Sequence, residues 1–130
     1  MIQLFDAIYK KFDSSVDFYN ALSGRFSYGR AKKNSEYPYA VYSSYATGDE
    51  STFSAEIDDV PIQMNIYSDD LSHSSCFELL KQCKELFRDT VLTVEDHENI
   101  TLSKVFEVPP IHDGDVWMAV IEFNCLLQAI

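Results

Sequence analysis

The 130-residue chain contains little glycine, proline and cysteine, with four, four and three residues of each. Its scattered glycines form neither G-x-x-x-x-G-K-[ST] nor G-x-G-x-x-G, so no loop is built to hold phosphate groups. The zinc-protease pattern H-E-x-x-H and the serine-hydrolase pattern G-x-S-x-G are also missing. We therefore expect no enzymatic activity, no catalytic residues and no cofactor.

The three cysteines are too few for a disulfide framework, and none occurs in a C-x-x-C pair. Cys76 and Cys83 share a predicted helix face but lie roughly 10 Å apart along it, beyond the ~7 Å limit between disulfide Cα atoms. Cys125 lies on an apolar strand face. We expect three free thiols in the core, as is usual for a protein made in a reducing compartment.

Long hydrophobic runs are also missing. The longest, Val116 to Ile121, has six residues, whereas a membrane-spanning helix needs ~20. The first thirty residues contain charges where a signal peptide would have an apolar block. We expect a soluble, unprocessed protein without a membrane partner.

Positive charge is scarce overall and unevenly distributed. Ten Lys and Arg against 21 Asp and Glu give a net charge of −11. Residues 1–33 hold six cations and three acids, a net +3, and the remaining residues hold four cations and 18 acids, a net −14. Because phosphate attraction dominates nucleic-acid affinity, a body this acidic disfavours tight DNA binding and favours a cationic or mixed protein partner.

The N-terminal third predicts two helices. Apolar residues recur there at steps of three and four, which is typical of an amphipathic helix; they are Ile2, Phe5, Ile8, Tyr9 and Phe12. Ser14 or Ser15 then offers an N-cap for a short second helix that ends near Gly24. Residues 25–36 follow as a basic connector.

Two long strands are expected next. Pro38 lacks a donor N–H and fits the entry of a strand over residues 39–46, and a second strand is expected over residues 51–67. The apolar positions change from odd to even near Asp58 and Asp59, which requires a bulge there because strand side chains alternate faces. This pattern predicts a long projecting β-hairpin.

The C-terminal half predicts one helix and further strands. Residues 75–88 have an apolar stripe preceded by the capping-box pair Ser75 and Glu78. A short strand over residues 91–94, a strand over residues 100–108 that ends at Pro109 and Pro110, and a strand over residues 116–127 with two apolar faces follow. We expect a single α+β domain, residues 1–130, with an antiparallel β-sheet of about four strands covered by an N-terminal helix and one central helix.

Two groups of residues have the composition of a binding site, one for a metal ion and one for nucleic acid. Acidic residues and imidazoles suited to a metal occur in two polar turns, Asp96-His97-Glu98 and His112-Asp113 with Asp115. Turns of this composition are usually solvated, so we expect no metal site. The basic connector also carries Phe26 and Tyr28 and suits a nucleic-acid backbone, although cations in an acidic protein more often face an acidic neighbour, such as another copy.

Three segments in a fixed order carry a resemblance: Tyr37-Pro38-Tyr39-Ala40-Val41-Tyr42, the alternating strand from Val60 to Ser68, and the helix after it. In this order they resemble the tail terminator (tail completion) family of long-tailed bacteriophages, from about Ile2 to Phe123. The resemblance implies a six-membered ring on the head-facing end of the tail tube, with the tube protein and the head-tail connector protein as partners. It also implies a virion protein made in the host bacterial cytoplasm, with DNA passing through the lumen without specific binding.

Charge distribution predicts the ring or tube contacts. Cations of one copy are expected to meet acids of the next; they are Arg25, Arg30, Lys32 and Lys33 against Asp58, Asp59, Asp69 and Asp70. Further contacts are expected at the hairpin, from Thr47, Gly48, Asp49, Glu50 and Phe53. The alternatives are another head-tail connector or neck protein, an acidic immunity or inhibitor protein that binds a basic toxin, and a small enzyme or ligand-binding domain.

Overall fold

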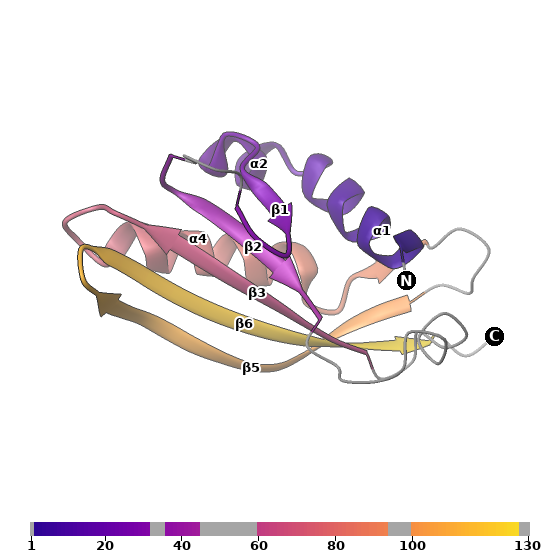
Figure 1. The fold of residues 1–130 in the computed structure, drawn as a ribbon. Coiled ribbons are helices and arrows are strands. Elements are labelled where there is room, and N and C mark those ends of the chain that lie inside the picture. Colours follow the sequence, from indigo (N-terminus) through magenta and orange to yellow (C-terminus); the bar gives the residue numbers. More distant parts are fainter. Residues whose placement is uncertain (1, 32–35, 45–59, 94–99, 128–130) are drawn as a thin grey trace.

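The computed structural model describes residues 2–31, 36–44, 60–93 and 100–127 (Figure 1). These residues form a mixed α+β fold in which a curved sheet is covered by helices. In chain order the elements are α1 (Ile2–Asp13), α2 (Val16–Leu22), β1 (Phe26–Tyr28), β2 (Tyr39–Ser43), β3 (Val60–Ser68), α4 (Ser74–Phe87), β4 (Val91–Leu92), β5 (Ile100–Asp113) and β6 (Val116–Leu127).

The sheet has six strands in the order β1-β2-β3-β6-β5-β4. All neighbours pair antiparallel except β1 and β2, which are parallel. The expected sheet of about four antiparallel strands was therefore too small. The sequence did not predict β1, which lies in the basic connector. It has three residues and one buried side chain, Phe26, and is too short to show the two-residue period of a strand.

The strands β2 and β3 pair antiparallel, from Tyr39 opposite Tyr67 to Ser43 opposite Gln63. Pro38 precedes β2 directly, as its missing N–H predicted. The expected hairpin tip, with the bulge near Asp58 and Asp59, lies outside the described residues and stays a prediction.

The longest hairpin of the described residues is formed by β5 and β6, which curve together along the lower side of Figure 1. Its turn is at Gly114 and Asp115, between the paired residues Asp113 and Val116. The expectation that Pro109 and Pro110 end the strand was wrong. Both prolines lie where the register shifts between Val108 and Ile111, and an irregular edge position tolerates a residue that cannot donate to the ladder.

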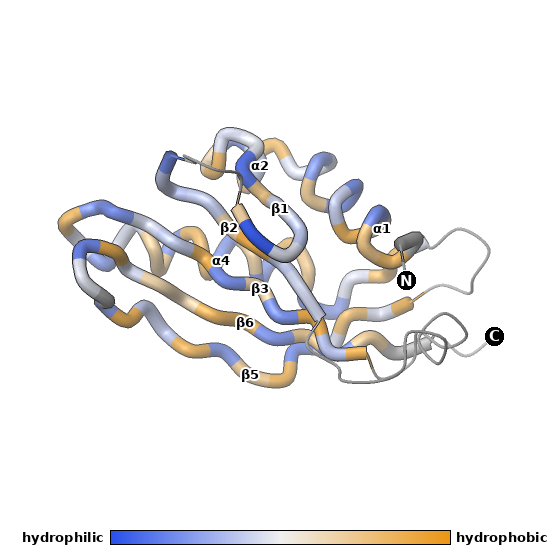
Figure 2. The backbone as a smooth tube through the Cα atoms, viewed as in Figure 1, coloured by the Kyte–Doolittle hydropathy of each residue, from blue (hydrophilic) through white to orange (hydrophobic). Residues whose placement is uncertain are grey.

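The core lies between the helices and one face of the sheet. On β3 every second side chain from Val60 to Ser68 is buried. Figure 2 shows hydrophobic and hydrophilic residues in alternation along this strand. Opposite them on β6, Ala119, Ile121, Phe123 and Cys125 are fully buried. The last strand, predicted to have two apolar faces, is central, since β6 lies between β3 and β5.

The helices confirm most of the periodic pattern and correct two details. The stripe predicted for α4 is buried at Cys76, Leu79, Leu80, Cys83 and Phe87. The capping box was wrong, because α4 begins one residue earlier and its N-cap is His73, which makes no side-chain cap bond.

The core side of α1 also differs from the predicted stripe. It is formed by Leu4, Ala7, Ile8 and Phe12, whereas Tyr9 is 39% exposed. The two stripes share Ile8 and Phe12, and the ring of Phe12 packs against those of Phe18 and Phe26, at 5.6 and 4.5 Å between ring centroids.

Candidate assembly surfaces

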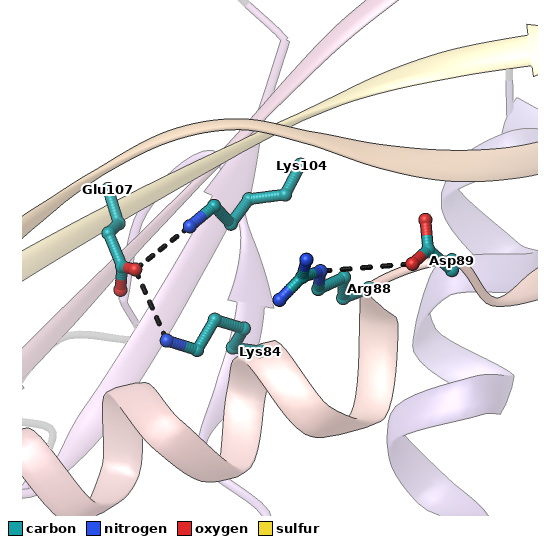
Figure 3. Close-up of polar contacts among 5 residues, drawn as sticks. All are labelled: Lys84, Arg88, Asp89, Lys104 and Glu107. Carbon is teal, nitrogen blue, oxygen red and sulfur yellow. Dashed lines mark hydrogen bonds and ion pairs between the residues drawn. The ribbon is translucent and has the colours of Figure 1, made fainter.

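A cluster of charged side chains joins α4 to β5 (Figure 3). Glu107 accepts hydrogen bonds from the Nζ atoms of Lys104 at 3.0 Å and Lys84 at 3.2 Å. The bond from Lys104, supported by Lys84, holds the pKa of the Glu107 carboxyl below its usual range despite partial burial. Just after α4, Arg88 lies 3.8 Å from Asp89.

A bulge makes this cluster possible. Lys104 and Glu107 are three residues apart, so in a regular strand their side chains would point to opposite faces. The register shifts between Lys104 and Phe106, which places Lys104 opposite Phe123 and Glu107 opposite Ile121. Both partners belong to the helix-covered face, and both β5 side chains therefore lie on the side of Lys84.

The cluster contains three of the four cations that follow residue 33. There are four in the sequence, namely Lys81, Lys84, Arg88 and Lys104. Three lie on or directly after α4 at spacings of three and four, which puts them on one side of the helix, and the fourth lies on β5. In a segment of net charge −14, this concentration of positive charge is a property of the tertiary structure.

A cleft of roughly 650 Å³ opens between α4 and β5, with Lys81 and Lys84 in its lining. Apolar and charged side chains line it together; they are His73, Ser74, Phe77, Glu78, Leu80, Lys81, Lys84, Glu107 and Pro109. Phe77 remains 45% exposed. The lining therefore combines apolar surface with two lysines and two glutamates, Glu78 and Glu107, whose charges balance.

The described residues hold no group of three or more His, Cys, Asp or Glu placed to bind a metal. Residues 96–98 of the metal candidate lie outside the described part. The ring of His112 lies 4.7 Å from that of Trp117, which in turn lies 5.7 Å from the ring of His73.

The cysteines are all buried, as predicted, and none forms a disulfide. Burial raises the pKa of the Cys76 thiol to about 11 and raises that of Cys83 further. Cys83 also contacts the sulfur of Met64 at 3.5 Å. These thiols contribute to packing.

The predicted basic contacts fall into three groups. Arg25 is half-buried and donates to the carbonyl oxygens of Pro38 at 3.0 Å and Tyr37 at 3.2 Å, which fastens the entry of β2 to the start of β1. Arg30 is exposed after β1. Lys32 and Lys33 lie outside the described residues, so their contacts stay predictions.

Of the predicted acidic contacts, Asp69 and Asp70 are exposed in the loop between β3 and α4. This loop lies at the end of the molecule opposite the first residues of α1 (Figure 1). The predicted hairpin contacts, residues 47–50 and Phe53, and the pair Asp58 and Asp59 lie outside the described part. Among the described residues, the structure therefore does not bring the predicted cations and acids together within one subunit.

Sequence reasoning overlooked the exposed apolar side chains of β5. Val105, Phe106 and Ile111 are 54%, 43% and 51% exposed. Phe106 and Ile111 are opposite Glu122 and Met118, so they lie on the face that the helices leave open. Two bulges break the alternation of β5, and the adjacent prolines 109 and 110 were the available signal of an irregular edge strand.

Comparisons with known proteins agree on family and fold. A family model described as tail completion protein gp17 matches residues 6–127. A chain in a solved structure of the virion of a native gene transfer agent particle shares the fold, with a TM-score of 0.66 and 9% identity over 94% of this chain and 92% of that one. A chain in a second solved structure shares it with a TM-score of 0.64 and 14% identity over 96% of both chains.

No curated protein sequence matches the chain. None of the helices in the described residues is long and apolar enough to cross a membrane.

Proposed function

The chain belongs to the tail completion protein gp17 family, and we propose that its copies form a ring that caps the head-proximal end of the phage tail tube. The family consists of structural virion proteins of the tail and neck and is not a family of enzymes. In this proposal the ring ends polymerisation of the tube and joins the tail to the head connector. The observation that carries it is the family match over residues 6–127.

The shared fold supports a place in the virion. The gene transfer agent chain belongs to a virion particle, and it matches nearly the whole length of this chain and of its own. An immunity or inhibitor protein is disfavoured by this family membership, although the acidic composition alone fitted that alternative.

The shape of the subunit supports head-to-tail assembly. A ring built by repeating one contact requires two different, complementary patches on each subunit. The six-stranded sheet has two unlike sides: the β1 side carries the exposed side chains of Tyr28 and Arg30, and the β5 side carries Val105, Phe106 and Ile111. Burial of the apolar side chains between copies would stabilise the ring by removing them from water.

The charge distribution supports both the contacts between copies and the passage of DNA through the lumen. The net +3 of residues 1–33 and the net −14 of the remainder provide complementary surfaces, with Arg30, Lys32 and Lys33 of one copy near Asp69 and Asp70 of the next. Acids that face the lumen would repel the phosphate backbone, so DNA would pass without specific binding.

The first test measures the native mass by light scattering over a wide concentration range, followed by negative-stain imaging. We expect a closed ring with a mass near six times that of the 14.9 kDa chain. The second test adds the protein to polymerising tail tube protein and measures tube lengths. We expect shorter tubes with one capped end.

Tubes that grow to their usual length in the presence of the protein would contradict the capping role. If the protein then bound the portal and not the tube, it would be a connector elsewhere in the neck.

A further inference from the structure

One face of the sheet carries almost no charge. It is the face that the described helices leave open, and it is formed by every second residue of four strands: from Tyr39 on β2, from Pro61 on β3 and from Met118 on β6, with the β5 residues opposite the last. Among these side chains only Glu122 is charged at neutral pH, and it is 5% exposed, although 24% of the chain is charged. Surfaces that are poor in charge and rich in aromatic residues and Met are typical of the centre of a protein interface.

The two halves of this uncharged face differ. On β3 the Gln63 amide donates to Asn65 at 2.8 Å, and the Asn65 amide donates to the Tyr67 hydroxyl at 3.2 Å, so these polar side chains satisfy one another. The half on β5 and β6 is apolar, and each of its members is at least partly exposed; they are Phe106, Val108, Ile111, Met118 and Val120. We call these five residues the apolar strip.

The uncharged face is large enough for a stable contact. Four strands about 4.8 Å apart, with four rows of side chains about 6.7 Å apart along them, cover roughly 500 Å². A specific interface needs at least about 1,000 Å² in total, which is about 500 Å² per partner. The face therefore has the size as well as the composition of one side of an interface.

A complementary aromatic surface lies at the other edge of the sheet. Tyr28 on β1 is 51% exposed, and its ring lies 4.2 Å from that of Phe5 on α1. Tyr9 is 39% exposed and follows Phe5 by four residues, so both lie on the same side of α1. We call Phe5, Tyr9 and Tyr28 the aromatic ridge.

The ridge and the strip belong to different sides of the subunit. In the strand order, β2, β3 and β6 separate β1 from β5, which corresponds to roughly 19 Å. Tyr28 is opposite the buried Tyr42, so its side chain is on the helix-covered side of the sheet, whereas the strip is on the open side. A contact between ridge and strip is therefore made between two copies and is head-to-tail.

Exposed charges flank both surfaces. Around the ridge two cations, Lys10 and Arg30, outnumber one acid, Asp6. Beyond the end of the strip, the β3–α4 loop and the β5–β6 turn lie at the same end of the molecule (Figure 1). They hold no Lys or Arg and three exposed acids, which we call the acidic end: Asp69, Asp70 and Asp115.

We propose that the aromatic ridge of one copy packs on the apolar strip of the next copy, with Tyr28 against Ile111 and Arg30 at the acidic end. The proposal rests on the proposed ring, because it names the surfaces by which the copies associate. Burial of the aromatic rings on the strip stabilises the contact, and the charges at the acidic end orient the two copies. Since the two surfaces are different, the contact repeats around a closed ring.

Insertion of a charge tests the contact. Ile111→Lys places a cation in the strip, and Phe77→Lys is the matched control, because the two side chains are 51% and 45% exposed and Phe77 lies on α4, on the other side of the sheet. Both variants should unfold at the wild-type urea concentration, since the replaced side chains are half-exposed. We expect Ile111→Lys to need at least about ten-fold more protein for half-assembly in light scattering, and Phe77→Lys to stay within about three-fold of wild type. Half-assembly of Ile111→Lys at the wild-type concentration, or an equal loss in both variants, would overturn the proposal.

Cross-linking separates this contact from the existence of the ring. A Tyr28→Cys variant is mixed with an Ile111→Cys variant and treated with a short bismaleimide, and Phe77→Cys replaces Ile111→Cys in the control. The native cysteines are buried, so the introduced thiols react first. We expect joined pairs of Tyr28→Cys with Ile111→Cys and none with Phe77→Cys.

A ring without this product would contradict the contact alone. Joined pairs of Ile111→Cys by itself would also overturn it, because two strips would then face each other. The product without a closed ring would support the contact and contradict the ring, and the absence of both would contradict both.

Discussion

Replacement of Phe26 by alanine tests the account of the core most directly. Phe26 lies on β1 and is only 3% exposed. Its ring lies near those of Phe12 and Tyr42, with centroids 4.5 and 4.6 Å away and interplanar angles of 19° and 15°. A further ring, that of Phe87 on α4, lies 6.0 Å away. One side chain of a three-residue strand therefore joins α1, β2 and α4.

The expected loss of stability on Phe26→Ala follows from the burial of this ring among other aromatic rings. Truncation of a buried Phe to Ala usually costs about 3–5 kcal/mol, because the apolar burial is lost and a cavity remains. The close contacts with neighbouring aromatic rings place this substitution in the upper half of that range, so we expect a loss of about 4–5 kcal/mol in the free energy of unfolding. With a urea dependence of about 2 kcal/mol/M for a domain of this size, the unfolding midpoint would fall by about 2 M.

The assay is urea unfolding at one low protein concentration, so that assembly does not alter the apparent stability. Circular dichroism follows the transition, and Leu71→Ala is the control, because that side chain is fully exposed and its truncation should change stability by less than about 0.5 kcal/mol. A loss of less than about 1.5 kcal/mol for Phe26→Ala would refute the central position of this side chain, since even the lowest usual cost of such a truncation is about twice as large.

Three further outcomes are expected. Glu107→Gln should lower the free energy of unfolding by less than about 1 kcal/mol near neutral pH, since the Lys104–Glu107 pair is partly exposed. Because the folded-state pKa of Glu107 is depressed, the difference from wild type should disappear as the pH falls below 4.5 through the folded-state value. A difference that persists at pH 2 would contradict the ion pair. The three buried thiols should not react with a thiol reagent at pH 8 in the folded protein and should all react in denaturant, and rapid labelling of the folded protein would contradict their burial. Ser15→Ala should destabilise the protein by about 1 kcal/mol in urea unfolding, because the Ser15 hydroxyl caps α2 by accepting from the Phe18 N–H at 3.2 Å, whereas an unchanged midpoint would show that this cap contributes nothing.

Elements with a long and regular period were predictable from the sequence. The buried stripe of α4 and the alternation of β3 both follow from side-chain spacing within one element. Ser15 was likewise a recognisable N-cap. Short or irregular elements were not predictable in this way: β1 has only three residues, and β5 continues through two prolines.

The candidate surfaces were predictable only in part. The spacing of Lys81, Lys84 and Arg88 places these cations on one side of a helix, and the exposed acids of the β3–α4 loop were named as contacts. The approach of Lys104 and Glu107 to that helix was not visible, because it depends on a bulge in β5 that changes which face each side chain occupies.

The sequence by itself determined the local structure, the acidic character and the resemblance to a phage tail family, because each depends on residue types and on spacings of a few residues. The tertiary structure alone decided that β1 pairs parallel with β2, which stripe of α1 faces the core, and that Lys104 and Glu107 of β5 meet Lys84 of α4. These features depend on contacts between residues far apart in the chain, whose packing chooses among locally equivalent arrangements.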